Sequence, residues 1–193
     1  MGFEEAPFDV VEASRRVWLE RWDEPAAASG MAVYTAILRS YQLLADQVND
    51  VVRAHDLTFP RYEVLTWLAT DPDSSLSLSW ISKTLRIPPA TVTNIIDRLE
   101  DDKLVRRVPH PSDARTTLAE ITARGRRVAD EATEDLNASV YERIGLSEAK
   151  RNRLVDLLAE LRAKGSEFDV ERSGEVIEEV RLRQADHRRS ASA

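Results

Sequence analysis

Two adjacent prolines, Pro88 and Pro89, constrain the fold of this chain more tightly than any other feature of its sequence. The residue before a proline is driven out of the α region, so a helix upstream of Pro88 has to end there. Pro89 suits the first turn of a new helix, where its missing N–H has no intrahelical partner to lose. The pair therefore predicts a break between two helices.

The segments on both sides of this break have helical patterns. On the N-terminal side, Ser79 is placed to cap a short helix over residues 80–85. On the C-terminal side, apolar residues at helical spacing predict a second helix over residues 90–102. This stripe consists of Val92, Ile95, Ile96 and Leu99. Two such helices indicate a helix-turn-helix, whose second helix enters the DNA major groove.

A hairpin is predicted directly after the second helix. Residues 104–109 and 116–121 are typical of strands, and His110-Pro111-Ser112-Asp113 between them is typical of a turn. Residues 76–78 are a candidate for a short third strand. The sequence thus predicts a mainly α fold with a small β-wing, which is a winged helix-turn-helix.

The tip of the predicted wing carries Asp113 and Arg115, two residues apart. The carboxylate can hold the guanidinium in a charge-assisted, bidentate pair. An arginine held in this way suits insertion into a narrow, negatively charged minor groove. An ordinary ion pair in a surface turn is the alternative, and the two residues alone do not separate these interpretations.

Several motifs together resemble those of the MarR family of transcriptional regulators, over residues 31–162. They are Leu57-Thr58-Phe59-Pro60-Arg61-Tyr62-Glu63-Val64-Leu65, Ala90-Thr91-Val92-Thr93-Asn94, Asp97-Arg98-Leu99-Glu100, Leu104-Val105-Arg106-Arg107 and the Asp-x-Arg wing ending in Ile121-Thr122. The resemblance implies an obligate homodimer held by flanking N- and C-terminal dimerisation helices. It also implies a pseudo-palindromic operator and a small ligand that weakens DNA binding.

The predicted DNA-binding residues lie on the second helix, the first strand of the hairpin and the wing tip. They are Ala90, Thr91, Thr93, Asn94, Arg98, Arg106, Arg107, Asp113 and Arg115. Asn94 and Arg98 have side chains that can read base edges, whereas threonine hydroxyls are better suited to phosphates. Asp97 is expected to orient a basic neighbour, and Asp113 to hold Arg115 without contacting DNA itself.

Three regions are predicted along the chain. Residues 1–30 form an N-terminal extension, with a helix over 8–22 followed by a linker over 23–30. Residues 31–165 form the MarR-type domain, with its DNA-binding module over about 57–127, as the resemblance implies. The charged tail over residues 166–193 is compatible with either a weak helix or disorder.

Further helices are expected on both sides of the module. They cover residues 33–54, 59–70 after a Thr58 cap, 122–140 with Thr122 as cap, and a last helix from Ser147 to Gly165. Their apolar stripes indicate either internal core or a dimer interface, and the resemblance favours the interface.

Composition excludes several classes of protein. The 193 residues include no cysteine, and the three histidines lack metal-ligand spacing, so neither a metal nor a disulfide is predicted. We also predict no cofactor and no catalytic residue, because phosphate-binding glycine loops, nucleophile elbows and HExxH motifs are missing. Without a signal-like start or a membrane-spanning run, the expected location is the cytoplasm, with no membrane partner.

The charge is unevenly distributed. The net charge is −7, yet residues 77–127 contain ten Lys and Arg against six Asp and Glu. A basic module on an acidic body is compatible with DNA binding because phosphate neutralisation is local. By itself, this excess is also unremarkable for a segment of that length.

A ligand pocket is the least defined expectation. Candidate residues near the junction of dimerisation helices and module are Trp18, Trp22, His55, Phe59, Arg61, Tyr62 and Trp67. Aromatic walls with one cation suit a small aromatic or carboxylate effector, although such aromatics also serve as core. The helix before Trp18 resembles one found in a urate-sensing subset of the family. Ile95 and Glu63 depart from that subset's arginine and aspartate.

These observations predict a homodimeric, sequence-specific regulator that binds double-stranded DNA, and a ligand-responsive repressor in particular. A winged-helix protein-interaction module without DNA binding is the alternative. The polar face of the second helix and the wing arginine favour the regulator.

Overall fold

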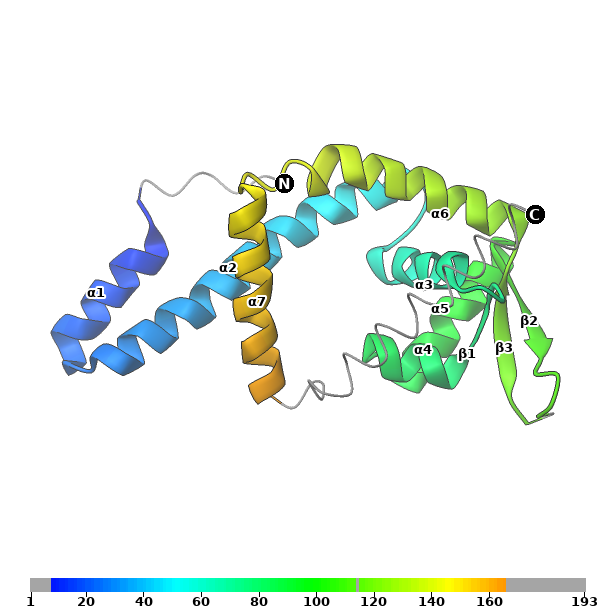
Figure 1. Cartoon of the computed structure of the whole chain (residues 1–193), viewed down its shortest axis with the longest axis horizontal. Coiled ribbons are helices and arrows are strands. Elements are labelled where there is room, and N and C mark those ends of the chain that lie inside the picture. Colours follow the sequence, from blue (N-terminus) through cyan, green and yellow to red (C-terminus); the bar gives the residue numbers. More distant parts are fainter. Residues whose placement is uncertain (1–7, 114, 166–193) are drawn as a thin grey trace.

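The computed structural model describes residues 8–113 and 115–165, a mainly helical chain with one small antiparallel sheet (Figure 1). The first elements are α1 (Val10–Trp22), α2 (Pro25–Arg53), α3 (Phe59–Thr70), β1 (Ser75–Ser77), α4 (Leu78–Leu85) and α5 (Pro89–Asp101). They are followed by β2 (Val105–Pro109), β3 (Thr117–Ile121), α6 (Ala123–Leu136), the π-helical turn η1 (Asn137–Tyr141) and α7 (Glu148–Lys164). The predicted tail over residues 166–193 lies outside the described residues.

Helices α1 and α2 form an arm that projects from the rest of the molecule (Figure 1). Asp9 caps α1, because its carboxylate accepts the N–H groups of Val11 and Glu12 at 2.9 and 3.3 Å. The predicted linker over residues 23–30 is wrong, since α2 already begins at Pro25. A proline suits the first helical turn and the alanines after it are strong helix formers, so this small-residue run extends the helix.

One hydrophobic core lies between α3, α4, α5, the sheet and α6. The stripe predicted for α5 is confirmed: Val92, Ile96 and Leu99 are fully buried and Ile95 is 8% exposed. Because an α-helix has 3.6 residues per turn, this burial leaves the opposite side of α5 in solvent. The core thus holds α5 with its polar face outward.

The break predicted at the two prolines is confirmed. Helix α4 ends at Leu85, where Arg86 adopts a left-handed conformation with φ of 53°. The N–H of Ile87 donates to the carbonyl of Ser82 at 3.1 Å, and the Ser82 hydroxyl donates to the carbonyl of Ile87 at 2.7 Å. Helix α5 begins at Pro89.

The cap of α4 differs from the prediction. Ser77, rather than Ser79, accepts the N–H of Trp80 at 3.1 Å, and the helix begins at Leu78. Ser77 has the extended backbone that a capping residue requires, whereas Ser79 already lies in the first turn. The two serine hydroxyls are 3.1 Å apart.

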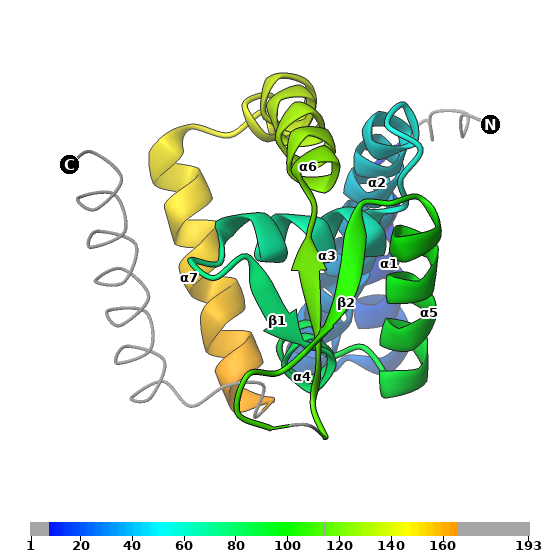
Figure 2. The ribbon, with the colours of Figure 1, turned by 90° about the vertical axis from the view of Figure 1, so that its right-hand side faces the viewer.

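The sheet has the strand order β1-β3-β2, and both pairings are antiparallel (Figure 2). In the β2–β3 hairpin, Val105 pairs with Ile121 and Pro109 with Thr117. The predicted third strand is confirmed as β1, one residue earlier than expected. The hairpin extends past the helices as the wing (Figure 2).

Helix α6 begins directly after β3 and packs very closely on the hairpin. Its predicted cap is confirmed, because the Thr122 hydroxyl accepts the N–H of Gly125 at 3.0 Å. A Cβ atom at Gly125 would lie 2.0 Å from the carbonyl oxygen of Leu104. Only glycine therefore allows this approach between α6 and the start of β2.

Apolar residues remain exposed on the arm and on α7. Helix α7 has no buried residue, and in a single chain the stripes of α2 and α7 are therefore largely not core. The exposed residues include Val33, Tyr34, Ile37, Leu38 and Tyr41 on α2, and Leu154, Val155, Leu157 and Leu161 on α7. Within the described ranges, no helix combines the length and apolar character that crossing a membrane demands.

Candidate nucleic-acid interface

The outward side of α5 consists of polar and small residues. Opposite the buried stripe, Ala90, Thr91, Thr93, Asn94 and Arg98 are all exposed. The Thr93 hydroxyl donates to the carbonyl of Pro89 at 3.1 Å and keeps its lone pairs available. Among the described residues no hydrogen bond or ion pair engages the side chains of Asn94 and Arg98. This face presents donors and acceptors whose partners lie outside the chain.

Arg107 is paired inside the molecule, and its contact with DNA stays a prediction. Its guanidinium donates to Asp97 at 2.6 Å and also to Glu100, and its N–H donates to Glu100 at 3.0 Å. Burial lowers the pKa of Arg107, but the hydrogen bonds to Asp97 and Glu100 outweigh it and raise that pKa above its usual value. Arg107 thus fixes β2 to the exposed edge of α5, and it is the basic neighbour expected for Asp97.

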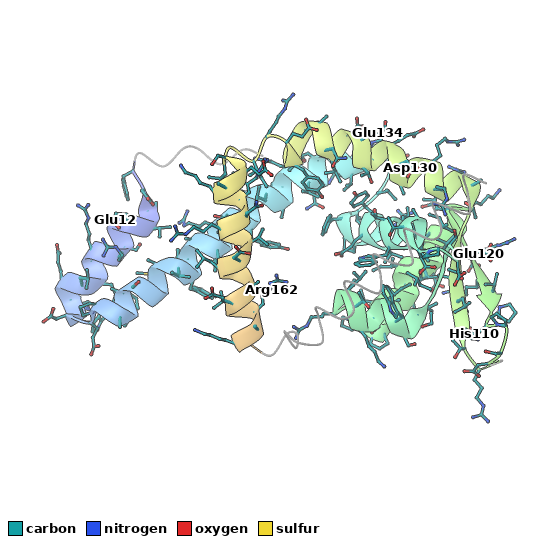
Figure 3. All side chains as sticks on the ribbon, viewed as in Figure 1. Glu12, His110, Glu120, Asp130, Glu134 and Arg162 are labelled. Atoms are coloured by element: carbon teal, nitrogen blue, oxygen red, sulfur yellow. The ribbon has the colours of Figure 1, made fainter. Side chains whose placement is uncertain are left out.

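Arg106 is paired across the hairpin with Glu120. The two residues are direct partners in the β2–β3 register, and the Arg106 guanidinium donates to Glu120 at 2.5 and 3.1 Å. Figure 3 shows Glu120 on the sheet and His110 nearer the wing tip. The Arg106 side chain is 64% exposed, so its charge still contributes to the potential around the wing.

The wing tip is organised differently from the prediction. The Asp113 carboxylate accepts the backbone N–H of Arg115 at 3.0 Å and the Thr116 hydroxyl at 2.7 Å. These hydrogen bonds lower the pKa of Asp113, and the one from Thr116 has the larger effect. A short carboxylate readily reaches the backbone two residues onward, which is why it closes a turn here instead of holding a guanidinium. The Arg115 residue itself is exposed.

Arg126 connects elements that sequence reasoning had left separate. From α6 its guanidinium donates to the carbonyl of Ala69 at 2.5 Å and to the Ser74 hydroxyl at 2.7 Å. It therefore anchors the end of α3 and the approach to β1. The sequence offered no signal for this role, because one acceptor is a backbone atom 57 positions away.

The predicted ligand residues fall into three places in the chain. Trp18 and Trp22 stack on each other within α1, with ring centroids 4.4 Å apart. Trp67 of α3 meets Trp80 of α4 edge-on at 5.4 Å. A single chain therefore does not bring these three residues to one site with the remainder.

The remaining candidates gather where α2, α3 and α6 meet. His55 Nε2 lies 2.8 Å from the Asp135 carboxylate, and the Tyr62 hydroxyl lies 3.0 Å from that of Thr133. The ring centroid of Phe59 is 6.2 Å from that of Tyr62. Burial raises the pKa of the neighbouring Glu63 carboxyl above its usual value. Arg61 is adjacent to Tyr62 in sequence, but its guanidinium is bound by the carboxylate of Asp102, after α5, and by the carbonyl of Asp56.

An open pocket of about 630 Å³ lies elsewhere, between the start of α4 and the base of the wing. Trp80, His110, Leu118 and the serines of the β1–α4 segment contribute to its lining. None of the predicted ligand residues lines it. Across residues 8–113 and 115–165, no cluster of His, Cys, Asp or Glu has the arrangement of a metal site.

Comparison with known proteins places this geometry among regulators. A model of the MarR family matches residues 55–116. The chain is 34% identical over 124 residues to the HTH-type transcriptional repressor IacR of Pseudomonas putida, an alignment that covers 63% of this chain and 72% of IacR.

Solved structures have the same fold. Sco5413, a MarR family transcriptional regulator from Streptomyces coelicolor, superposes with a TM-score of 0.66 at 36% identity, over 73% of this chain and 98% of Sco5413. Sco3205 from the same organism, in complex with DNA, gives 0.62 at 24% identity, over 72% and 88%. NadR in complex with 4-hydroxyphenylacetate gives 0.56 at 25% identity, over 67% and 91%.

Proposed function

The chain belongs to the MarR family of transcriptional regulators, and from that premise we propose a specific function for it. It is a homodimeric, cytoplasmic repressor that binds a pseudo-palindromic operator and is released by a small aromatic or carboxylate effector. Family membership supports a DNA-binding regulator, not an enzyme. The dimer, the repressor role and the effector are our proposal.

The observation that carries this proposal is the two-sided character of α5. Its apolar stripe is buried, and its opposite face exposes Asn94 and Arg98 without partners in the described chain. Asparagine can bind adenine, and arginine can bind guanine, through paired hydrogen bonds in the major groove. A protein-interaction module would not require this combination.

The exposed apolar faces of α2 and α7 support the dimer. A soluble monomer rarely leaves so many large apolar side chains in contact with water. A second copy would cover them and would pair the two modules about a twofold axis. Two recognition helices related in this way require an inverted repeat with half-sites about 10 bp apart.

The group of residues where α2, α3 and α6 meet supports the effector. His55, Phe59, Tyr62 and Glu63 combine aromatic surface with polar atoms, as small-molecule sites do. In NadR, a member of the same fold, the bound molecule is 4-hydroxyphenylacetate, an aromatic carboxylate. An effector here would release DNA only to the extent that it binds one dimer geometry better than the other.

Selection of DNA fragments from the protein's own genome tests the proposal. The expected product is a set of inverted repeats to which the native protein binds and Asn94→Ala binds with altered base preference. Asn137→Ala, which replaces an exposed asparagine on η1, is the matched control and should keep the native preference. Recovery of no common sequence by the native protein would contradict DNA recognition. A stable monomer in light scattering at micromolar concentration would contradict the dimer.

Effector release needs a separate assay. A panel of phenolic and carboxylate compounds should include one that weakens the complex with the selected DNA. Tyr62→Phe, which removes only the hydroxyl next to Thr133, should shift the concentration at which that compound acts. An unchanged response in this variant and in His55→Ala would place the effector elsewhere.

A further inference from the structure

Arg61 connects three parts of the chain: the turn after α2, the start of α3 and the end of α5. It lies in the first turn of α3, and its side chain is only 15% exposed. One guanidinium nitrogen donates to the carbonyl of Asp56 at 3.1 Å, and another is bound by the carboxylate of Asp102. We call this arrangement the Arg61 bridge.

The Asp56 end of the bridge lies in the connection between the arm and the module. Helix α2 ends at Arg53, and Asp56 adopts a left-handed conformation with φ of 58°. The next N–H, that of Leu57, donates back to the carbonyl of Val52 at 3.1 Å. This short turn is the direct covalent link by which the orientation of α2 reaches the module.

The Asp102 end of the bridge lies at the C-terminus of the recognition helix. Asp102 follows the last residue of α5, and Lys103 after it has a φ of 60°. The N–H of Leu104 donates to the carbonyl of Leu99 at 2.8 Å, which closes the helix end. The bridge therefore connects the end of α5 to the turn that follows α2.

Because the Arg61 side chain is largely buried, its charge depends on the partners that the bridge provides. The Nε atom of Arg61 is buried and has no hydrogen-bond partner among the described residues. A guanidinium removed from water in this way depends on its carboxylate, because an unpaired buried charge is strongly unfavourable. Loss of Asp102 would leave a cation that has to move toward solvent and release the carbonyl of Asp56.

We infer that the Arg61 bridge sets the angle between arm and recognition helix, and thereby selects the half-site spacing of the operator. Arg61 is a positioning residue and does not itself contact DNA or effector. In a dimer joined through α2, a change of this angle moves the two recognition helices relative to each other. The operator consequence rests on the function proposed above, whereas the angle itself does not.

Spin-label distances test the angle without DNA. The chain has no cysteine, so Gln47→Cys on α2 and Thr84→Cys on α4 would give one defined pair of labels. Dimers assembled with excess unlabelled chain keep each measured pair within one chain. The native background should give a narrow distance distribution, and both Arg61→Ala and Asp102→Asn should broaden it. The double variant should be no broader, because both changes remove one interaction.

The chain offers a matched control for these variants. Arg53 donates to Asp50 at 3.2 Å near the same turn, but both side chains lie on α2 and are at least 70% exposed. Arg53→Ala and Asp50→Asn should leave the distance distribution narrow. Asp102→Asn carries the test if Arg61→Ala fails to fold, because Asp102 is half-exposed and at a helix end. Unchanged widths in Asp102→Asn and in folded Arg61→Ala would overturn the inference.

Operators with half-sites moved apart by single base pairs test the consequence. The native protein should bind one spacing best. Both bridge variants should reduce the ratio of the association constants for the best and the next-best spacing by about tenfold, a typical effect of losing a charged hydrogen bond. A general loss of stability would weaken binding at all spacings and leave this ratio intact, which would overturn spacing selection by the bridge. Broadened distances in variants of a protein that selects no DNA would uphold the bridge and contradict the proposed function.

Discussion

At the scale of single residues, the wing tip shows how a short side chain determines the shape of a turn. Asp113 binds the N–H of Arg115 and the hydroxyl of Thr116, so it presents Arg115 through the backbone. The arginine side chain is left to reach outward. This geometry allows Arg115 to enter the minor groove. Asp113 would then support that role by closing the turn, not by pairing with the guanidinium.

Variants of the two wing residues should therefore be coupled. We expect Arg115→Ala to weaken operator binding by about 1–3 kcal/mol, the range for a specific arginine contact. Asp113→Ala should weaken binding by a part of that amount, because the unclosed wing tip then loses more conformational entropy when it binds DNA. The double variant should be no weaker than Arg115→Ala in fluorescence anisotropy. Additive losses would contradict the coupling, and Arg143→Ala, in an exposed segment outside the module, serves as the control.

Glu63 provides a prediction on pH. Burial raises the pKa of its carboxyl in the folded protein, so the folded state binds this proton more tightly than the unfolded state does. The protonated Glu63 carboxyl therefore contributes to the free energy of unfolding below the ordinary glutamate pKa. This contribution is lost as the pH rises through the pKa that Glu63 has in the folded protein. Glu63→Gln should accordingly raise the melting temperature at neutral pH and should have a smaller effect near pH 4. An equal effect at both pH values would exclude ionisation as the cause.

At the scale of elements, the sequence predicted what depends on local rules. Pro88 and Pro89 separate α4 from α5, and the stripe around Ile96 is buried as its spacing requires. The predicted cap of α4 is Ser79, whereas Ser77 caps the helix, and the small-residue run after Pro25 is part of α2 instead of the predicted linker. In both cases the residue types are right for a cap or a break, but the backbone places the start of the helix earlier in the chain.

The interactions that position the elements were beyond local rules. Arg61, Arg107 and Arg126 are all paired inside the fold, with partners on other elements or in other turns. From the sequence, an arginine in a basic module indicates DNA or ligand binding as readily as an internal ion pair. Only the three-dimensional arrangement separates the arginines that hold the interface from those, such as Arg98, that face outward.

The contact of α6 with the hairpin can be tested with two glycines. Gly125→Ala should destabilise the fold by about 1–3 kcal/mol or more, because its Cβ would overlap the carbonyl of Leu104. Gly30→Ala is the matched control, since nothing lies within 4 Å of a Cβ there and alanine favours a helix interior by about 0.5–1 kcal/mol. Denaturant unfolding should thus move in opposite directions for the two variants. A neutral Gly125→Ala would contradict the close approach.

At the scale of the whole molecule, charge divides the chain into a basic module and an acidic remainder. The basic excess of residues 77–127 lies on the module, whereas the remaining sequence carries the acidic balance. Figure 3 shows acidic side chains, Asp130 and Glu134, on α6 above the module and Glu12 on the distant arm. An acidic body should keep the protein from binding nucleic acid through surfaces other than α5 and the wing.

This division predicts a specific dependence on salt. If the two modules of a dimer neutralise about six phosphates, the logarithm of the operator association constant should fall with the logarithm of salt concentration at a slope of about −5. Arg115→Ala should make this slope shallower, since each subunit loses one cation near the backbone. Asn94→Ala should weaken binding at all salt concentrations and leave the slope unchanged, because an uncharged side chain releases no counterion. Anisotropy titrations from 50 to 200 mM salt, about the range over which such affinities change strongly, separate the two effects. A flat titration of the native protein would show that α5 and the wing do not bind phosphate.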